Sequence, residues 1–167
     1  MNHSWPFKKR NSNSHYPANM DFPIYRQLAQ MDCGPTCLRM IAQHYGKHFA
    51  PGLLNRLTRI THKGTSLLKL RKAAEKMGFK TLAAAVTFEQ LDNETPLPCI
   101  VLWQQNHFVV IPPQNYSSNN PRSKILIADP EKGLVKIDKT TFLESWMEKD
   151  SGQGVVLMLE PAKAFYR

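Results

Sequence analysis

The chain is predicted to be an α+β domain in which a helical N-terminal part is followed by an antiparallel β-sheet. Apolar residues recur at helical spacing in the first half, whereas from Leu97 onward short apolar runs are separated by turn residues. Helices followed by a series of strands are typical of this fold class. The 167 residues allow one domain with a sizeable core.

Three helices are expected in the first half. Ser66 is the expected N-cap of the third helix, and Gly78 is its expected C-terminal cap. In the first helix Cys37, Leu38 and Ile41 recur on one face, which should contact the core. The predicted ranges are residues 34–45, 53–60 and 67–77. A capping-box pattern over residues 87–90 indicates a further short helical turn.

Five strands are expected in the second half, since its short apolar runs are bounded by turn residues. A second capping-box pattern, Thr141 to Glu144, predicts a short helix that ends at Trp146. A long polar loop covers residues 112–124. The predicted strands are Cys99–Trp103, Phe108–Ile111, Ile125–Ala128, Leu134–Ile137 and Val155–Leu159.

The ends of the chain differ from its middle. Residues 1–21 are polar and include Lys8-Lys9-Arg10, so we expect a flexible basic tail. The folded domain is expected over residues 22–160, with a C-terminal linker over 161–167. No apolar run of about 18 residues predicts a membrane span, and the N-terminus lacks the apolar segment of a secretory signal.

The formal net charge of +9 is compatible with nucleic acid, an anionic surface or an acidic partner. The sequence shows no zinc-finger spacing, no Walker-type glycine-rich loop and no aromatic–basic RNA signature. A nucleic-acid-binding module therefore has only the charge in its favour, and we expect no nucleic-acid partner. The His, Cys and Asp residues do not have metal-ligand spacing, so no metal or cofactor is expected.

Cys33 is the candidate nucleophile. It lies where a polar segment ends and the first helix begins, and the positive end of a helix dipole favours the thiolate form. Cys37 and Cys99 are expected in the core. Asp32 is expected to bond backbone N–H groups at the helix terminus and to take no catalytic step. A buried structural thiol is the ordinary alternative for Cys33.

His107 and Asp129 are the candidate partners of this cysteine. A histidine can take the thiol proton and return it to a leaving amine, and a carboxylate can orient the imidazole. Neither residue need be catalytic. His107 could be a strand histidine with local hydrogen bonds, and Asp129 could be a turn aspartate before Pro130. Cysteine, histidine and aspartate in this order, each at the edge of a predicted element, are what a thiol hydrolase requires.

Four separate segments resemble the C39 peptidase family, the papain-like domains that open the chains of peptide-exporting ABC transporters. The resemblance covers roughly residues 22–160. It implies that Cys33, His107 and Asp129 form a catalytic triad and that the Gln27 side chain donates to the oxyanion. The matching residues are Gln27, Asp32-Cys33, Met40, Tyr45-Gly46, His107-Phe108 and Asp129-Pro130.

By this resemblance the chain is a cysteine endopeptidase that removes leader peptides after a Gly-Gly (or Gly-Ala) pair. The implied partners are the leader peptide and the membrane and ATP-binding domains of an exporter, at the cytoplasmic face of the membrane; ATP would act only through those absent domains. Family leaders often carry acidic residues. We therefore expect the basic face of the third predicted helix, with Lys69, Lys72 and Lys76, or the basic tail, to attract them.

Two alternatives share the same residues. A degenerate member of the family would bind a leader without cutting it, although such domains typically lack the nucleophile, which is present here. Another papain-like activity, such as an amidase or a transglutaminase, would use the same triad. The spacing of Gln27 and Cys33 and the order of the motifs argue against this second alternative.

Overall fold

The computed structural model describes residues 21–59, 64–115 and 123–167. The predicted tail, except Asp21, lies outside these residues, as do Ile60 and residues 116–122 of the predicted polar loop. Within the described residues, no helix is long and apolar enough to cross a membrane.

The N-terminal part is helical, as predicted. The Ser66 hydroxyl accepts from the backbone N–H of Lys69, which makes it the N-cap of the third helix. The second helix begins two residues earlier than expected, with Pro51 at a position that tolerates a missing N–H. The first three helices are α1 (Cys33–His44), α2 (Pro51–Thr58) and α3 (Leu67–Lys76).

One six-stranded antiparallel sheet forms the rest of the domain, with the order β1-β6-β2-β3-β4-β5. The five predicted strands are present. The strand that was not predicted is β1, which contains three consecutive alanines and pairs along its whole length with β6. The strands are β1 (Phe79–Val86), β2 (Cys99–Trp103), β3 (His107–Ile111), β4 (Lys124–Asp129), β5 (Gly133–Asp138) and β6 (Gly154–Pro161).

Two short helices accompany the sheet. The α4 helix (Phe88–Asn93) begins with both hydrogen bonds of the predicted capping box. The α5 helix (Lys139–Trp146) differs from the prediction, because it starts earlier and its N-cap is Asp138, whose carboxylate accepts from the backbone N–H of Thr141. The expected capping box at Thr141 is therefore wrong.

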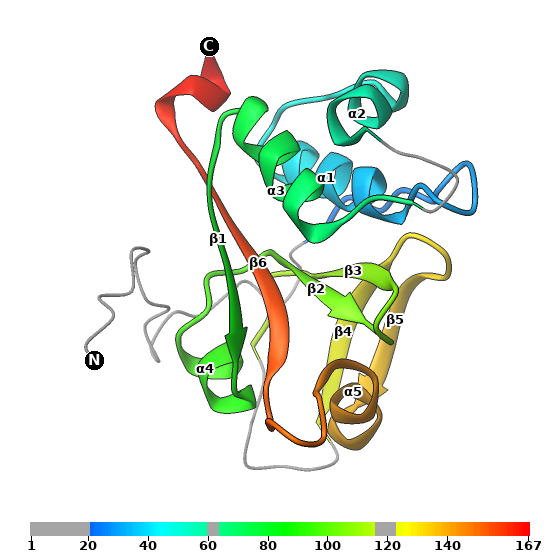
Figure 1. Ribbon diagram of the computed structural model, residues 1–167, viewed down its shortest axis with the longest axis vertical. Helices are drawn as coiled ribbons and strands as arrows, with labels where there is room; N and C mark the ends of the chain where they lie inside the picture. Colours follow the sequence, from blue (N-terminus) through cyan, green and yellow to red (C-terminus); the bar gives the residue numbers. More distant parts are fainter. Residues whose placement is uncertain (1–20, 60–63, 116–122) are drawn as a thin grey trace.

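The core has two layers, one on each face of the sheet. Alternation along β6 shows this directly: Leu157 and Leu159 belong to the layer under α1 and α3, and Val156 and Met158 to the layer under α4 and α5. Figure 1 shows α1, α2 and α3 gathered at one end of the molecule, above the strands that bear the candidate site residues.

The last residues are packed against the helical layer. A 3-10 helix, η1 (Lys163–Tyr166), follows β6, and Phe165 within it is fully buried. The Lys47 ammonium donates to the Phe165 carbonyl at 2.7 Å. Residues 161–167, which we expected as a linker, thus contribute a side chain to the core.

Candidate active site

A cleft of about 910 Å³ lies where the helical layer meets the ends of the central strands. Loop 26–31 and the pair Gly64 and Thr65 form its helical side. The β2–β3 turn and residues 129–132 form its sheet side. Cys33 and His107 both line this cleft.

Cys33 is the first residue of α1 and is partly exposed in the cleft. Asp32 is buried, and its carboxylate accepts from the backbone N–H of Ala29 at 3.1 Å. Its side chain caps no N–H of α1. The expected backbone bond exists, but it holds the loop before the helix instead of the helix terminus.

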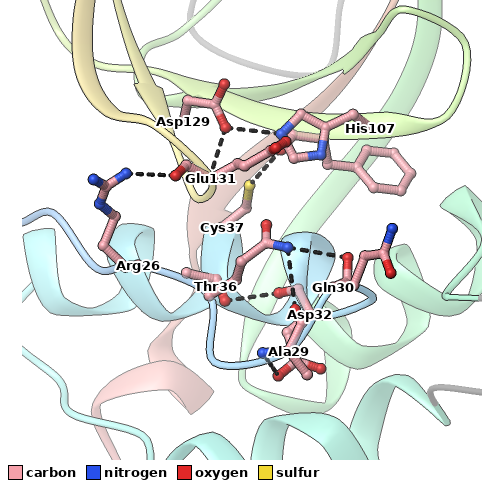
Figure 2. A network of polar contacts seen from close by, with 11 residues as sticks. Arg26, Ala29, Gln30, Asp32, Thr36, Cys37, His107, Asp129 and Glu131 are labelled. Atoms are coloured by element: carbon pink, nitrogen blue, oxygen red, sulfur yellow. Dashed lines mark hydrogen bonds and ion pairs between the residues drawn. The ribbon is translucent and has the colours of Figure 1, made fainter.

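His107 and Asp129 face one another across neighbouring strands. His107 is the first residue of β3 and Asp129 the last of β4, and since these strands are antiparallel, the two positions meet at one end of the sheet. His107 Nε2 lies 2.8 Å from Asp129 Oδ1, which also accepts from the backbone N–H of Glu131. Figure 2 shows this pair above the start of α1.

The protonation of this pair follows from its contacts. Burial disfavours the charged form of His107, but hydrogen bonds with Asp129 and Cys33 outweigh burial and raise the pKa of His107 to about 9. Burial likewise opposes the charge of Asp129, yet the hydrogen bonds from His107 and from the Glu131 backbone lower the pKa of Asp129. At neutral pH the pair is therefore an imidazolium and a carboxylate.

Gln27 lines the same cleft, and its backbone N–H donates to the Pro130 carbonyl at 2.9 Å. Its side-chain Nε2 donates to the carbonyls of Ala29 and Gln30, at 3.1 and 3.0 Å. Its Oε1 is buried and accepts no hydrogen bond from the described residues. The amide that was expected to face an oxyanion is thus directed into its own loop.

Two contacts in the site were not anticipated. The Arg26 guanidinium donates to the Glu131 carbonyl and so ties loop 26–31 to the segment after Asp129. The buried Cys37 thiol donates to the Phe108 carbonyl at 3.4 Å, which joins α1 to the strand of His107. Both link segments far apart in the chain, and local sequence patterns carry no signal of such contacts.

The three lysines proposed to attract a leader lie on α3. Lys72 and Lys76 are exposed and Lys69 is half-buried, and none of the three lines the cleft. In the part of the chain that the structure describes, no group of three or more His, Cys, Asp or Glu residues could hold a metal ion.

The chain is similar to parts of two transport/processing ATP-binding proteins. It is 35% identical over 143 residues to the transport/processing ATP-binding protein ComA of Streptococcus pneumoniae, a match that covers 81% of this chain and 18% of ComA. It is 30% identical over 167 residues to the lactococcin-A transport/processing ATP-binding protein LcnC of Lactococcus lactis, covering 96% of this chain and 20% of LcnC. The chain thus spans a fifth or less of these relatives.

Solved structures show the same fold. A double glycine motif protease from an AMS/PCAT transporter, in complex with its leader peptide, matches with a TM-score of 0.74 and 27% identity, over 85% of this chain and 93% of that one. The peptidase domain of Streptococcus ComA matches with a TM-score of 0.71 and 25% identity, over 84% and 99%. The fold is the papain-like α+β fold of these domains.

A sequence profile of the peptidase C39 family matches residues 21–164. This range contains the described helices and strands and all four predicted catalytic residues. The chain belongs to the peptidase C39 family.

Proposed function

We propose that this chain is a cysteine endopeptidase that cleaves leader peptides after a double-glycine motif. The observation that supports this most strongly is the position of Cys33 at the start of α1, in a cleft, beside an imidazole that Asp129 orients. A relative with this fold is a double glycine motif protease in complex with a leader peptide.

The geometry suggests a role for each group. Asp129 engages His107 Nε2, so Nδ1 is the ring nitrogen left to exchange a proton with the Cys33 thiol. The thiolate would attack the carbonyl carbon of the scissile bond, and the imidazolium would then protonate the leaving amine. Water would hydrolyse the resulting thioester, with His107 as general base.

Gln27 is proposed as an oxyanion donor that becomes available when a substrate binds. Its Nε2 now donates to two carbonyls of loop 26–31. To reach an oxyanion at Cys33, the amide must exchange at least one of these bonds for the new one. Since its Oε1 has no hydrogen-bond donor among the described residues, the present arrangement leaves the amide only half satisfied.

The relatives suggest the wider context. ComA and LcnC are named as transport and processing proteins, and this chain matches less than a quarter of each. We propose that the domain works with the membrane and ATP-binding domains of such an exporter, at the cytoplasmic face of the membrane. The α3 lysines are proposed to attract acidic leaders from outside the cleft.

The test is cleavage measured by mass spectrometry. The reduced protein is mixed with leader peptides that contain Gly-Gly, with Cys33→Ala as the control. A single cut after Gly-Gly, absent in the control, is the expected result. Leader binding without cutting would instead indicate a docking domain, and an acyl transfer to an added amine would indicate a transglutaminase.

A further inference from the structure

The turn between β4 and β5 holds the Asp129 carboxylate through its own backbone. Residues 130–132 form this turn. The N–H of Glu131 donates to Asp129 Oδ1 at 2.8 Å, and the N–H of Lys132 also donates to this carboxylate. Burial opposes the charge of Asp129, whereas the hydrogen bonds from His107 and from these two N–H groups lower the pKa of Asp129. How firmly the carboxylate is held therefore depends on the orientation of two peptide groups.

The carbonyl oxygens of the same two peptide groups accept hydrogen bonds from the segment before α1. The Pro130 carbonyl shares its peptide group with the Glu131 N–H, and it accepts from the backbone N–H of Gln27 at 2.9 Å. The Glu131 carbonyl shares its peptide group with the Lys132 N–H, and it accepts from the Arg26 guanidinium (Figure 2). Two consecutive residues thus bind two consecutive carbonyls of the turn.

This arrangement transmits position from the segment before α1 to the triad. A trans peptide group is planar, and its C=O and N–H point in opposite directions. A donor that fixes the oxygen therefore also fixes the direction of the N–H, and it polarises the group so that the N–H becomes a stronger donor. Asp129 is in this way held by residues from the other side of the cleft, and Asp129 in turn lies 2.8 Å from His107 Nε2.

The Arg26 side chain lies over the turn at a second point. A Cβ atom placed on Gly133, which ends the turn with a φ of +88°, would lie 3.7 Å from Arg26 Nε and 3.8 Å from Arg26 Cζ. The guanidinium thus lies just beyond the place that a side chain at position 133 would take. Because residue 26 is exposed, replacing its side chain should affect the turn more than the core.

We propose that Arg26 is a positioning residue, which orients the second peptide group of the turn toward Asp129 and so holds Asp129 against His107. For its effect on catalysis this inference rests on the proposed peptidase function. The segment that carries the proposed oxyanion donor, Gln27, thereby also holds the carboxylate that orients the imidazole.

Arg26→Met removes the donor and keeps a long side chain. The turn then loses one of its two bonds to the segment before α1, and Asp129 is held less firmly. The pKa of His107 should therefore fall by about half a pH unit or more, roughly a threefold loss of proton affinity. Removal of a positive charge that acted directly on His107 would raise this pKa, so a fall reports lost position.

Two further variants serve as rescue and control. The bond from Arg26 to the turn uses a single nitrogen, and an ammonium can replace it, so Arg26→Lys should keep most of the raised pKa of His107. Arg56 is an exposed arginine on α2 that does not line the cleft. Arg56→Met removes the same charge from the helical layer and should leave the pKa of His107 unchanged.

The first measurement is an NMR titration of His107 in the full chain. Every variant carries Cys33→Ala, so that the thiol does not contribute, and circular dichroism checks that each remains folded. A fall of the pKa of His107 in Arg26→Met alone is the expected result. An unchanged pKa in Arg26→Met, or an equal fall in Arg56→Met, would overturn the inference.

The second measurement is steady-state cleavage of a Gly-Gly leader with Cys33 intact. Arg26→Met should lower kcat by about tenfold or more with little change in KM, because a small displacement of a catalytic group affects the transition state more than binding. A raised KM with an unchanged kcat would overturn the inference, since Arg26 would then act on leader binding.

The two measurements also separate this inference from the proposed function. A fall of the pKa of His107 in Arg26→Met, in a protein that hydrolyses no leader, would support the inference and contradict the peptidase. Hydrolysis after Gly-Gly, together with the same pKa of His107 in every variant, would support the peptidase and overturn the inference.

Discussion

Replacing Asp129 with asparagine should return His107 to an ordinary histidine. A rise in the pKa of His107 from 6.5 to about 9 favours the imidazolium by about 3 kcal/mol. Burial opposes this rise, and the Asp129 hydrogen bond is the foremost contact that produces it. Asparagine keeps the shape but not the charge, so once the Cys33 thiol is also removed only burial remains, and the pKa of His107 should fall to 6.5 or below.

The assay is an NMR titration of the His107 ring in a Cys33→Ala background, which removes the contribution of the thiol. We expect a raised pKa of His107 in Cys33→Ala alone and its loss once Asp129→Asn is added. A raised value that persists without Asp129 would refute the electrostatic argument, and so would an ordinary value in Cys33→Ala alone.

The same pair makes stability depend on pH. Folding raises the pKa of His107, so His107 contributes fully to the free energy of unfolding below pH 6.5. This stabilisation is lost as pH rises through about 9. Folding lowers the pKa of Asp129, so the stabilisation by its carboxylate is lost as pH falls through the pKa that Asp129 has in the folded protein. Urea unfolding should therefore show a larger stability difference between the unchanged protein and Asp129→Asn at pH 6 than at pH 10; equal differences would contradict this.

Three further predictions concern other parts of the domain. Gln27→Ala should lower kcat by roughly 10²–10³-fold with little change in KM; an unchanged kcat would remove Gln27 from the mechanism. Replacing Lys69, Lys72 and Lys76 with glutamate should weaken leader binding at low salt and flatten its salt dependence, measured by fluorescence anisotropy; unchanged binding would exclude the basic face. Gly154→Ala places a Cβ 2.0 Å from an indole carbon on α5, so it should destabilise the fold by about 1–3 kcal/mol in urea unfolding, and an unchanged midpoint would contradict that packing.

Features set by near neighbours in the chain could be predicted from the sequence. Ser66 and Thr87 cap their helices through residues three positions away, and both caps are present. β1 could not be predicted, because its alanines have little strand preference of their own and its pairing with β6 comes from the far end of the chain. Asp138 displaced Thr141 as the cap of α5 because its carboxylate accepts the Thr141 N–H.

In the site, too, features set by neighbours in the chain could be predicted, whereas those set by distant segments could not. Cys33, His107 and Asp129 could be named because each has a recognisable local context. Their mutual geometry arises from the antiparallel pairing of β3 and β4 and from the packing of α1 on β3. The place of Thr65 against Gly34 depends on a contact between a loop and the first turn of α1, which no periodicity or motif encodes.

The position of β6 has a consequence for synthesis. This last strand lies between β1 and β2, and its pairings are what join β1, with the α3 helix packed on it, to the strands that carry His107 and Asp129. While residues 154–161 remain inside the ribosome, the two portions of the sheet have no hydrogen-bonded link. The α3 helix and β1 therefore become joined by hydrogen bonds to the strands of His107 and Asp129 only after these residues emerge.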